Sequence, residues 1–123
     1  MVGYLMRRPI AAAAGLVLAL GGAAAVAQQV AAAGSAGSAE IAIENFAFSP
    51  ETLTVAPGTA VTWSNHDEEP HNIVNVPGAG QQRAFRSQAV DGGEKYSFVF
   101  NQPGTYSYIC SIHPHMQGTV VVK

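Results

Sequence analysis

The sequence contains a single cysteine, Cys110, among its 123 residues. One cysteine excludes a disulfide within the chain, so the fold must be stable without a disulfide framework. Charged residues are also scarce, at 11% of the chain, and only six are Lys or Arg. Because these few basic residues form no cluster, the sequence offers no basic patch of the kind that binds nucleic acid.

The N-terminal part of the chain is almost free of charge. Residues 1–38 carry only Arg7 and Arg8, and residues 10–26 consist entirely of Ala, Leu, Val, Gly and Ile. Residues 25–27 (Ala-Val-Ala) are small, as a signal peptidase requires. This pattern predicts a secretory signal peptide over residues 1–27 and hence a periplasmic protein. An uncleaved membrane anchor is the alternative, but the apolar run is slightly shorter than the roughly 18 residues of a spanning helix.

The remainder divides into a short connecting segment and one domain. Residues 28–38 are small or polar and have no hydrophobic period, so we interpret them as a flexible linker. We expect the globular domain over residues 39–123. Removal of residues 1–27 leaves four basic residues against eight acidic ones, and therefore a net charge of −4.

The domain consists of short apolar or alternating runs separated by Pro, Gly and Asn. These runs fall near residues 41–48, 52–55, 59–64, 71–76, 96–100, 105–110 and 119–122, with a weaker signal at 84–87. No segment after residue 38 has a helical period of useful length. Seven to eight short strands, with turns about every 8–12 residues, predict an all-β sandwich with Greek-key connections.

The residues with distinctive chemistry gather in the loop before the last predicted strand. Cys110, His113 and Met116 follow one another with two residues between each pair. A thiolate, an imidazole and a thioether so close together can surround one point. A second imidazole, His71, begins a predicted strand 39 residues before Cys110. Two His and one Cys with a weak axial Met form the ligand set of a blue copper site. We therefore predict one type 1 copper ion per chain.

Two other imidazoles compete for the role of ligand. His115 is next to Met116, and neighbouring residues in an extended loop point to opposite sides. We therefore favour His113 as the ligand and expect His115 to face solvent. His66 precedes the acidic run of residues 67–69 and is interpreted as an exposed loop residue. That acidic run is either a solvated loop or a docking edge for a basic partner.

Four motifs make the sequence similar to a known family. They are Val61-Thr62-Trp63-x-Asn65, Pro70-His71-Asn72, Gly104-Thr105-Tyr106-x-Tyr108-x-Cys110 and His113-Pro114-x-Met116-x-Gly118. On these motifs the chain resembles the cupredoxins, the blue copper proteins, from residue 39 to residue 123. The two-residue spacings in the ligand loop resemble the amicyanin and pseudoazurin side of the family. The resemblance implies copper ligation by His71, Cys110, His113 and Met116.

The resemblance also bears on residues next to the ligands. It implies that Asn72 ties the His71 strand to the Cys110 loop near Ser111. Ile112 departs from the family pattern, because the relatives usually have a proline directly before the loop histidine. Unlike proline, Ile112 has an N–H that can donate toward the thiolate sulfur, and such a hydrogen bond favours Cu(I) and raises the reduction potential.

The function implied by the resemblance is the transfer of single electrons between redox partners. These partners would be a dehydrogenase-type donor and a cytochrome c-type acceptor, each met transiently by a monomeric carrier. We expect no enzymatic activity, because the sequence has no Ser/His/Asp arrangement, paired catalytic carboxylates or phosphate-binding loop. The alternative is a copper chaperone or storage protein, which would need a site from which copper exchanges readily.

Overall fold

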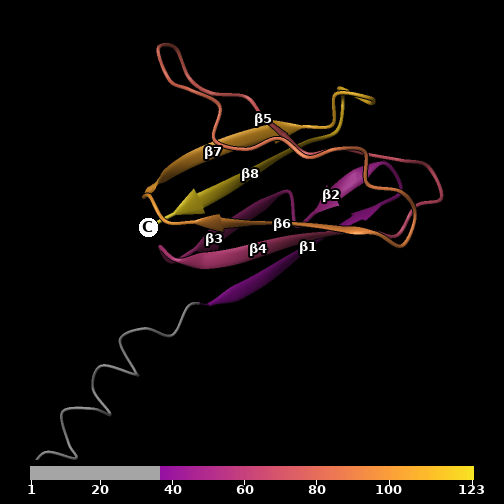
Figure 1. The fold of residues 1–123 in the computed structure, drawn as a ribbon, viewed down its shortest axis with the longest axis horizontal. Coiled ribbons are helices and arrows are strands. Elements are labelled where there is room, and N and C mark those ends of the chain that lie inside the picture. Colours follow the sequence, from indigo (N-terminus) through magenta and orange to yellow (C-terminus); the bar gives the residue numbers. More distant parts are fainter. Residues whose placement is uncertain (1–36) are drawn as a thin grey trace, which may run out of the picture. The chain divides into compact units, whose positions relative to one another are not determined.

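The computed structural model describes residues 37–123 as two stacked four-stranded sheets (Figure 1). The strands are β1 (Ser38–Glu44), β2 (Ala47–Ser49), β3 (Thr52–Val55), β4 (Thr59–Asn65), β5 (Val74–Asn75), β6 (Lys95–Phe100), β7 (Gly104–Ile109) and β8 (Gln117–Val122). The prediction of an all-β sandwich is confirmed. Within the described part of the chain, no helix has the length and apolar character needed to cross a membrane. The predicted signal peptide lies outside the described residues.

The chain crosses repeatedly between the two sheets. The first sheet has the order β2-β1-β4-β6, in which β1 and β4 run parallel and the other neighbours antiparallel. The second sheet has the order β3-β8-β7-β5, in which β3 and β8 run parallel. Because β3 leaves the first sheet and β4 returns to it, each sheet is built from segments distant in sequence. The loops between strands therefore come together at the ends of the sandwich.

The core lies between the sheets and follows the period-two alternation of the strands. Ile41 and Ile43 of β1 are fully buried, as is Trp63 of β4. The Trp63 ring lies 5.4 Å from the Tyr108 ring and 6.3 Å from the Phe100 ring, measured between centroids. Strand propensity and burial agree here, because β-branched and aromatic side chains pack well on pleated surfaces. This aromatic core supports the β7 strand that leads to Cys110.

Two predicted strands differ from the structure. The run near residues 41–48 is a hairpin of β1 and β2, joined at Asn45 and Phe46 with φ angles of 53° and 58°. The run near residues 71–76 contains only the two-residue strand β5. Before it, His71 forms an isolated bridge with Val90. Strand β1 begins at Ser38, one residue before the predicted start of the domain.

Candidate metal centre

The predicted ligands lie on two segments at one end of the sandwich. The His71 N–H donates to the Val90 carbonyl at 3.1 Å and the Val90 N–H donates back at 2.7 Å, which fixes the first segment. Cys110 directly follows β7, and the loop after it leads into β8 at the end away from the marked C-terminus (Figure 1). Within this loop the Met116 N–H donates to the His113 carbonyl at 2.9 Å, and the Cys110 N–H donates to the Met116 carbonyl at 3.1 Å. The loop is therefore closed on itself.

Three potential ligand atoms converge between these segments. Cys110 Sγ lies 3.8 Å from His71 Nδ1 and 3.9 Å from His113 Nδ1, and the two Nδ1 atoms are 3.2 Å apart. His71 and Cys110 are fully buried, whereas His113 is half-buried. Met116 is 2% exposed. One thiolate with two imidazoles is a donor set that suits copper, because sulfur stabilises Cu(I) and imidazole binds both oxidation states.

A carboxylate behind His71 fixes the orientation of its ring. Asp67 Oδ2 lies 2.9 Å from His71 Nε2. Burial raises the pKa of Asp67, but hydrogen bonds from the Phe46 and Asn45 amides and from His71 outweigh it, so the pKa lies below its ordinary value. The ionised carboxylate can only accept, so the proton resides on Nε2. The lone pair of Nδ1 then faces Cys110, as a metal ligand requires.

The comparison with known families agrees with this donor set. Residues 35–123 match the model of the copper-binding proteins of the plastocyanin/azurin family. The chain belongs to this family. Copper is therefore the cofactor of this copper-binding protein.

Individual relatives and solved structures are similar to this copper-binding protein over most of its length. It is 40% identical to amicyanin-alpha of Methylorubrum extorquens over 72% of this chain and 74% of that protein. It is 34% identical to the amicyanin of Paracoccus denitrificans over 71% of this chain and 66% of that protein. A purple cupredoxin from Nitrosopumilus maritimus superposes with a TM-score of 0.63 at 35% identity, covering 69% of this chain and 99% of that one.

Asn72 connects the two ligand-bearing segments of the copper-binding protein. Its Nδ2 donates to Ser111 Oγ at 2.7 Å, and its Oδ1 accepts the Ser111 N–H at 2.7 Å. The predicted tie between Asn72 and the Cys110 loop is confirmed. The Asn72 N–H also points at Cys110 Sγ over 3.5 Å. No hydrogen bond from the Ile112 N–H to Sγ is present among the described residues, so the amide donor to sulfur is Asn72 and not Ile112.

The remaining imidazoles lie outside the ligand group. His115 is exposed, and its ring centroid is 6.4 Å from that of His113. His66 is exposed too. Sequence reasoning missed Asp67, which it grouped with two exposed neighbours, Glu68 and Glu69. The signal that could have identified Asp67 is its spacing of four residues from His71, since ligand histidines commonly donate their second N–H to a carboxylate.

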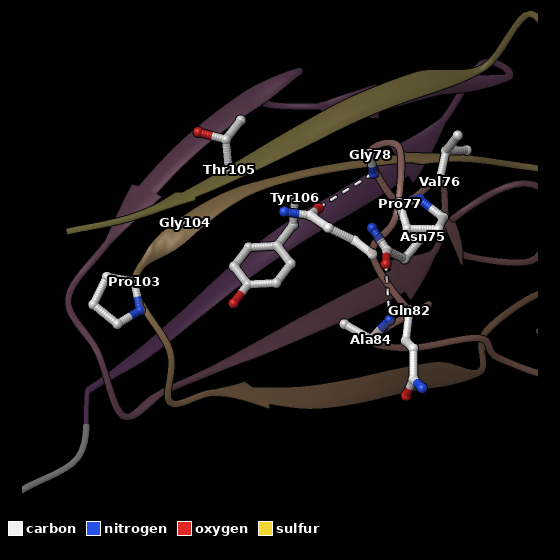
Figure 2. Close-up of a pocket in the computed structure, with 11 residues that line it drawn as sticks. Asn75, Val76, Pro77, Gly78, Gln82, Ala84, Pro103, Gly104, Thr105 and Tyr106 are labelled. Carbon is white, nitrogen blue, oxygen red and sulfur yellow. Dashed lines mark hydrogen bonds between the residues drawn. The ribbon is translucent and has the colours of Figure 1, made fainter.

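A separate hollow of about 310 Å³ lies against the start of β7 (Figure 2). Its lining contains no charged side chain and none of the candidate ligands, and comes from residues 75–78, 81, 82, 84 and 103–106. Its polar groups pair with each other: the Gly78 N–H donates to Gln81 Oε1 at 3.3 Å, and the Ala84 N–H donates to Asn75 Oδ1 at 2.8 Å. The chemistry of the copper-binding protein is therefore concentrated in the ligand group and not in this hollow.

Proposed function

We propose that the chain carries single electrons on one type 1 copper ion, bound by His71, Cys110, His113 and, as a weak axial ligand, Met116. The observation that supports this assignment is the convergence of one Sγ and two Nδ1 atoms, all within 4.8 Å of one another. The burial of Met116 beside this group and its place in the closed loop support the fourth ligand. Copper bound there supplies a one-electron couple between Cu(II) and Cu(I).

The protein contributes a dry and preformed site with one accessible edge. His71, Cys110 and Met116 are buried, so water is kept from most of the ligand group. His113 is half-buried and is the only proposed ligand with appreciable exposed surface. Its imidazole therefore offers the route by which an electron reaches a partner. Ile112, 46% exposed, adds an apolar neighbour suited to a brief contact.

Burial of the ligands also separates this function from copper delivery or storage. A chaperone must release copper readily, which calls for ligands that an acceptor protein can reach. His71 and Cys110 are both fully buried, and the hydrogen bonds of His71 to Asp67 and of Asn72 to Ser111 hold their segments in place. We therefore favour the carrier over the chaperone or storage protein, and we propose no catalytic activity for the chain alone.

The colour of the copper-loaded protein tests the proposal. A thiolate bound to Cu(II) in a blue site gives an intense absorption at about 600 nm. We expect this band in the wild type, its loss in Cys110→Ala and its retention in the matched variant His115→Ala. A colourless copper-loaded wild type would refute the carrier and favour storage. Loss of the band in His115→Ala would refute the ligand assignment.

We further propose that the protein acts in the periplasm after removal of residues 1–27. The sequence pattern of the N-terminus supports export, and the resemblance supports a monomer that meets a dehydrogenase-type donor and a cytochrome c-type acceptor. N-terminal sequencing of the periplasmic fraction tests the cleavage. A start near Gln28 is expected, whereas an intact N-terminus in the membrane fraction would indicate an anchor.

A further inference from the structure

The turn that joins β1 and β2 has an unexpected residue in a left-handed conformation. Asn45 and Phe46 have φ angles of 53° and 58°. Asn tolerates this region, but a bulky aromatic residue is rarely found there, and Gly is favoured at the second position of such two-residue turns. Backbone strain of this kind persists only where the surroundings hold it, and it concentrates at functional sites.

The side chain of Asp67 holds the strained turn. Its Oδ1 accepts the Asn45 N–H at 2.7 Å and its Oδ2 accepts the Phe46 N–H at 3.0 Å. The same Oδ2 accepts the Nε2 proton of His71 at 2.9 Å. One carboxylate therefore joins the turn directly to a proposed copper ligand. Any movement of the turn is coupled to the orientation of the His71 ring.

The strained conformation places the Phe46 ring against both imidazoles of the site. Its centroid lies 5.2 Å from that of His71 and 5.0 Å from that of His113, with interplanar angles of 89° and 87°. These are edge-to-face contacts, which aromatic rings favour. Phe46 is 37% exposed, whereas His71 is fully buried. The ring therefore lies on the solvent side of His71 and also packs against the half-buried His113.

We propose that the Asn45–Phe46 turn is a fixed cover of the copper centre, in which the Phe46 ring positions both imidazoles and keeps water from them. The inference deepens the proposed function and rests on it for the role of copper. The cover itself is a property of the protein fold, so it can be tested without the metal. Phe46→Gly would relieve the backbone strain of the turn but remove the ring that covers the imidazoles. The stability of the fold should therefore change little, while the protection of the imidazoles from solvent should fall.

The test compares Phe46→Gly with variants that separate ring, backbone and surface effects. Phe46→Tyr keeps an aromatic ring on the same backbone. Val99→Ala removes another exposed apolar side chain, 48% exposed, from β6 and outside the site. The first readout is the rate at which diethyl pyrocarbonate modifies His113 in the metal-free full chain, located by peptide mass spectrometry. The exposed imidazole of His66 serves as an internal reference.

We expect Phe46→Gly to accelerate modification of His113 several-fold and leave that of His66 unchanged. Phe46→Tyr and Val99→Ala should behave as the wild type. In the copper-loaded chain, Phe46→Gly should lose copper to a chelator about tenfold faster, a typical effect of losing a group that supports ligands. Its reduction potential should fall, because water near the site favours Cu(II). The melting temperature should change little, since strain relief offsets the lost ring contacts.

Equal rates of His113 modification in the wild type and Phe46→Gly would overturn the cover. If Phe46→Gly does not fold, Phe46→Leu removes the aromatic ring without placing glycine in the turn. If His113 is modified in Phe46→Leu as slowly as in the wild type, an aromatic ring is not needed for the cover. A chain that binds no copper but shows the expected His113 rates would refute the proposed function and leave the cover standing. A wild type that shows the expected colour with copper but leaves His113 unprotected would refute the cover and leave the proposed function standing.

Discussion

Gly118, two residues after Met116, has no room for a side chain. It lies on β8 directly opposite Tyr108 of β7. A Cβ at this position would lie 2.8 Å from Tyr108 Cε2 and closer still to Cζ and Oη. The Tyr108 ring cannot withdraw, because it is 1% exposed and packs 4.8 Å from the Phe48 ring and 5.4 Å from the Trp63 ring. We therefore predict that Gly118→Ala destabilises the protein.

The magnitude follows from the rigidity of the surroundings. Inserting one methyl group into a well-packed core costs about 1–3 kcal/mol, and the contacts on the far side of Tyr108 place Gly118→Ala near the middle of that range. For a domain of this size, ~2 kcal/mol corresponds to a fall of roughly 8–16 °C in melting temperature. Since Tyr108 is two residues before Cys110, displacement of the ring should also broaden the visible absorption band of the copper-loaded protein.

Urea unfolding of the metal-free chain, followed by tryptophan fluorescence, measures this cost. Tyr108→Phe is the matched control, because Tyr108 Oη is buried without a hydrogen-bond partner among the described residues and its removal should be nearly neutral. The double variant should recover about 1 kcal/mol of the loss as a coupling energy, since one of the crowded atoms is gone. Stability of Gly118→Ala within about 0.5 kcal/mol of the wild type, or no coupling, would refute the steric reasoning.

Three further predictions concern hydrogen bonds around the site and on the sheet. Asn72→Ala should lower the free energy of unfolding by about 1–2 kcal/mol, because it leaves the Ser111 N–H without its acceptor. Urea unfolding measures this loss, and an unchanged midpoint would contradict it. The Ser64 hydroxyl and then Lys95 lower the pKa of Glu40. The ionised form therefore stabilises the fold, and this stabilisation is lost as pH falls below 4.5 through the lowered pKa. Urea midpoints of Glu40→Gln should hence decline less on acidification than those of the wild type, and parallel declines would be evidence against the linkage. Ile112→Pro should leave the reduction potential unchanged in voltammetry, since the Ile112 amide does not donate to sulfur; a lower potential would mean that it does so when copper is bound.

The proposed ligand group could be assigned from the sequence because three of its members are close together in the chain. Spacing within one loop restricts where Cys110, His113 and Met116 can point, and the soft donor set is uncommon enough to identify its metal. His71 was assigned as a ligand from its position at the start of a predicted strand and from the family resemblance. The alternation of apolar residues was likewise sufficient for the all-β sandwich, because a half-buried strand imposes a period of two.

The cover over the site could not be predicted in the same way. The large apolar residues change phase between Ile43 and Phe46, as at a turn, but nothing local reveals that Phe46 adopts a positive φ. Asp67 was missed because three consecutive acids are usually solvated. Its inward direction depends on the side chain of Asn65, whose Oδ1 accepts the Asp67 N–H at 2.9 Å and whose Nδ2 donates to the Val90 carbonyl at 2.9 Å. The contact between Asn65 and Val90 is tertiary, so a single sequence does not reveal it.

The hydrogen bonds around His71 explain how the site can keep its shape in both oxidation states. Asp67 ties the His71 ring to the β1–β2 turn of the first sheet. Asn72 ties the same segment to the β7–β8 loop of the second sheet. The segments that carry the proposed ligands are thus fixed by contacts from both layers of the sandwich, and these contacts are made between protein atoms alone. A site held by the protein in this way changes little when an electron arrives or leaves, and electron transfer is fast when little reorganisation is needed.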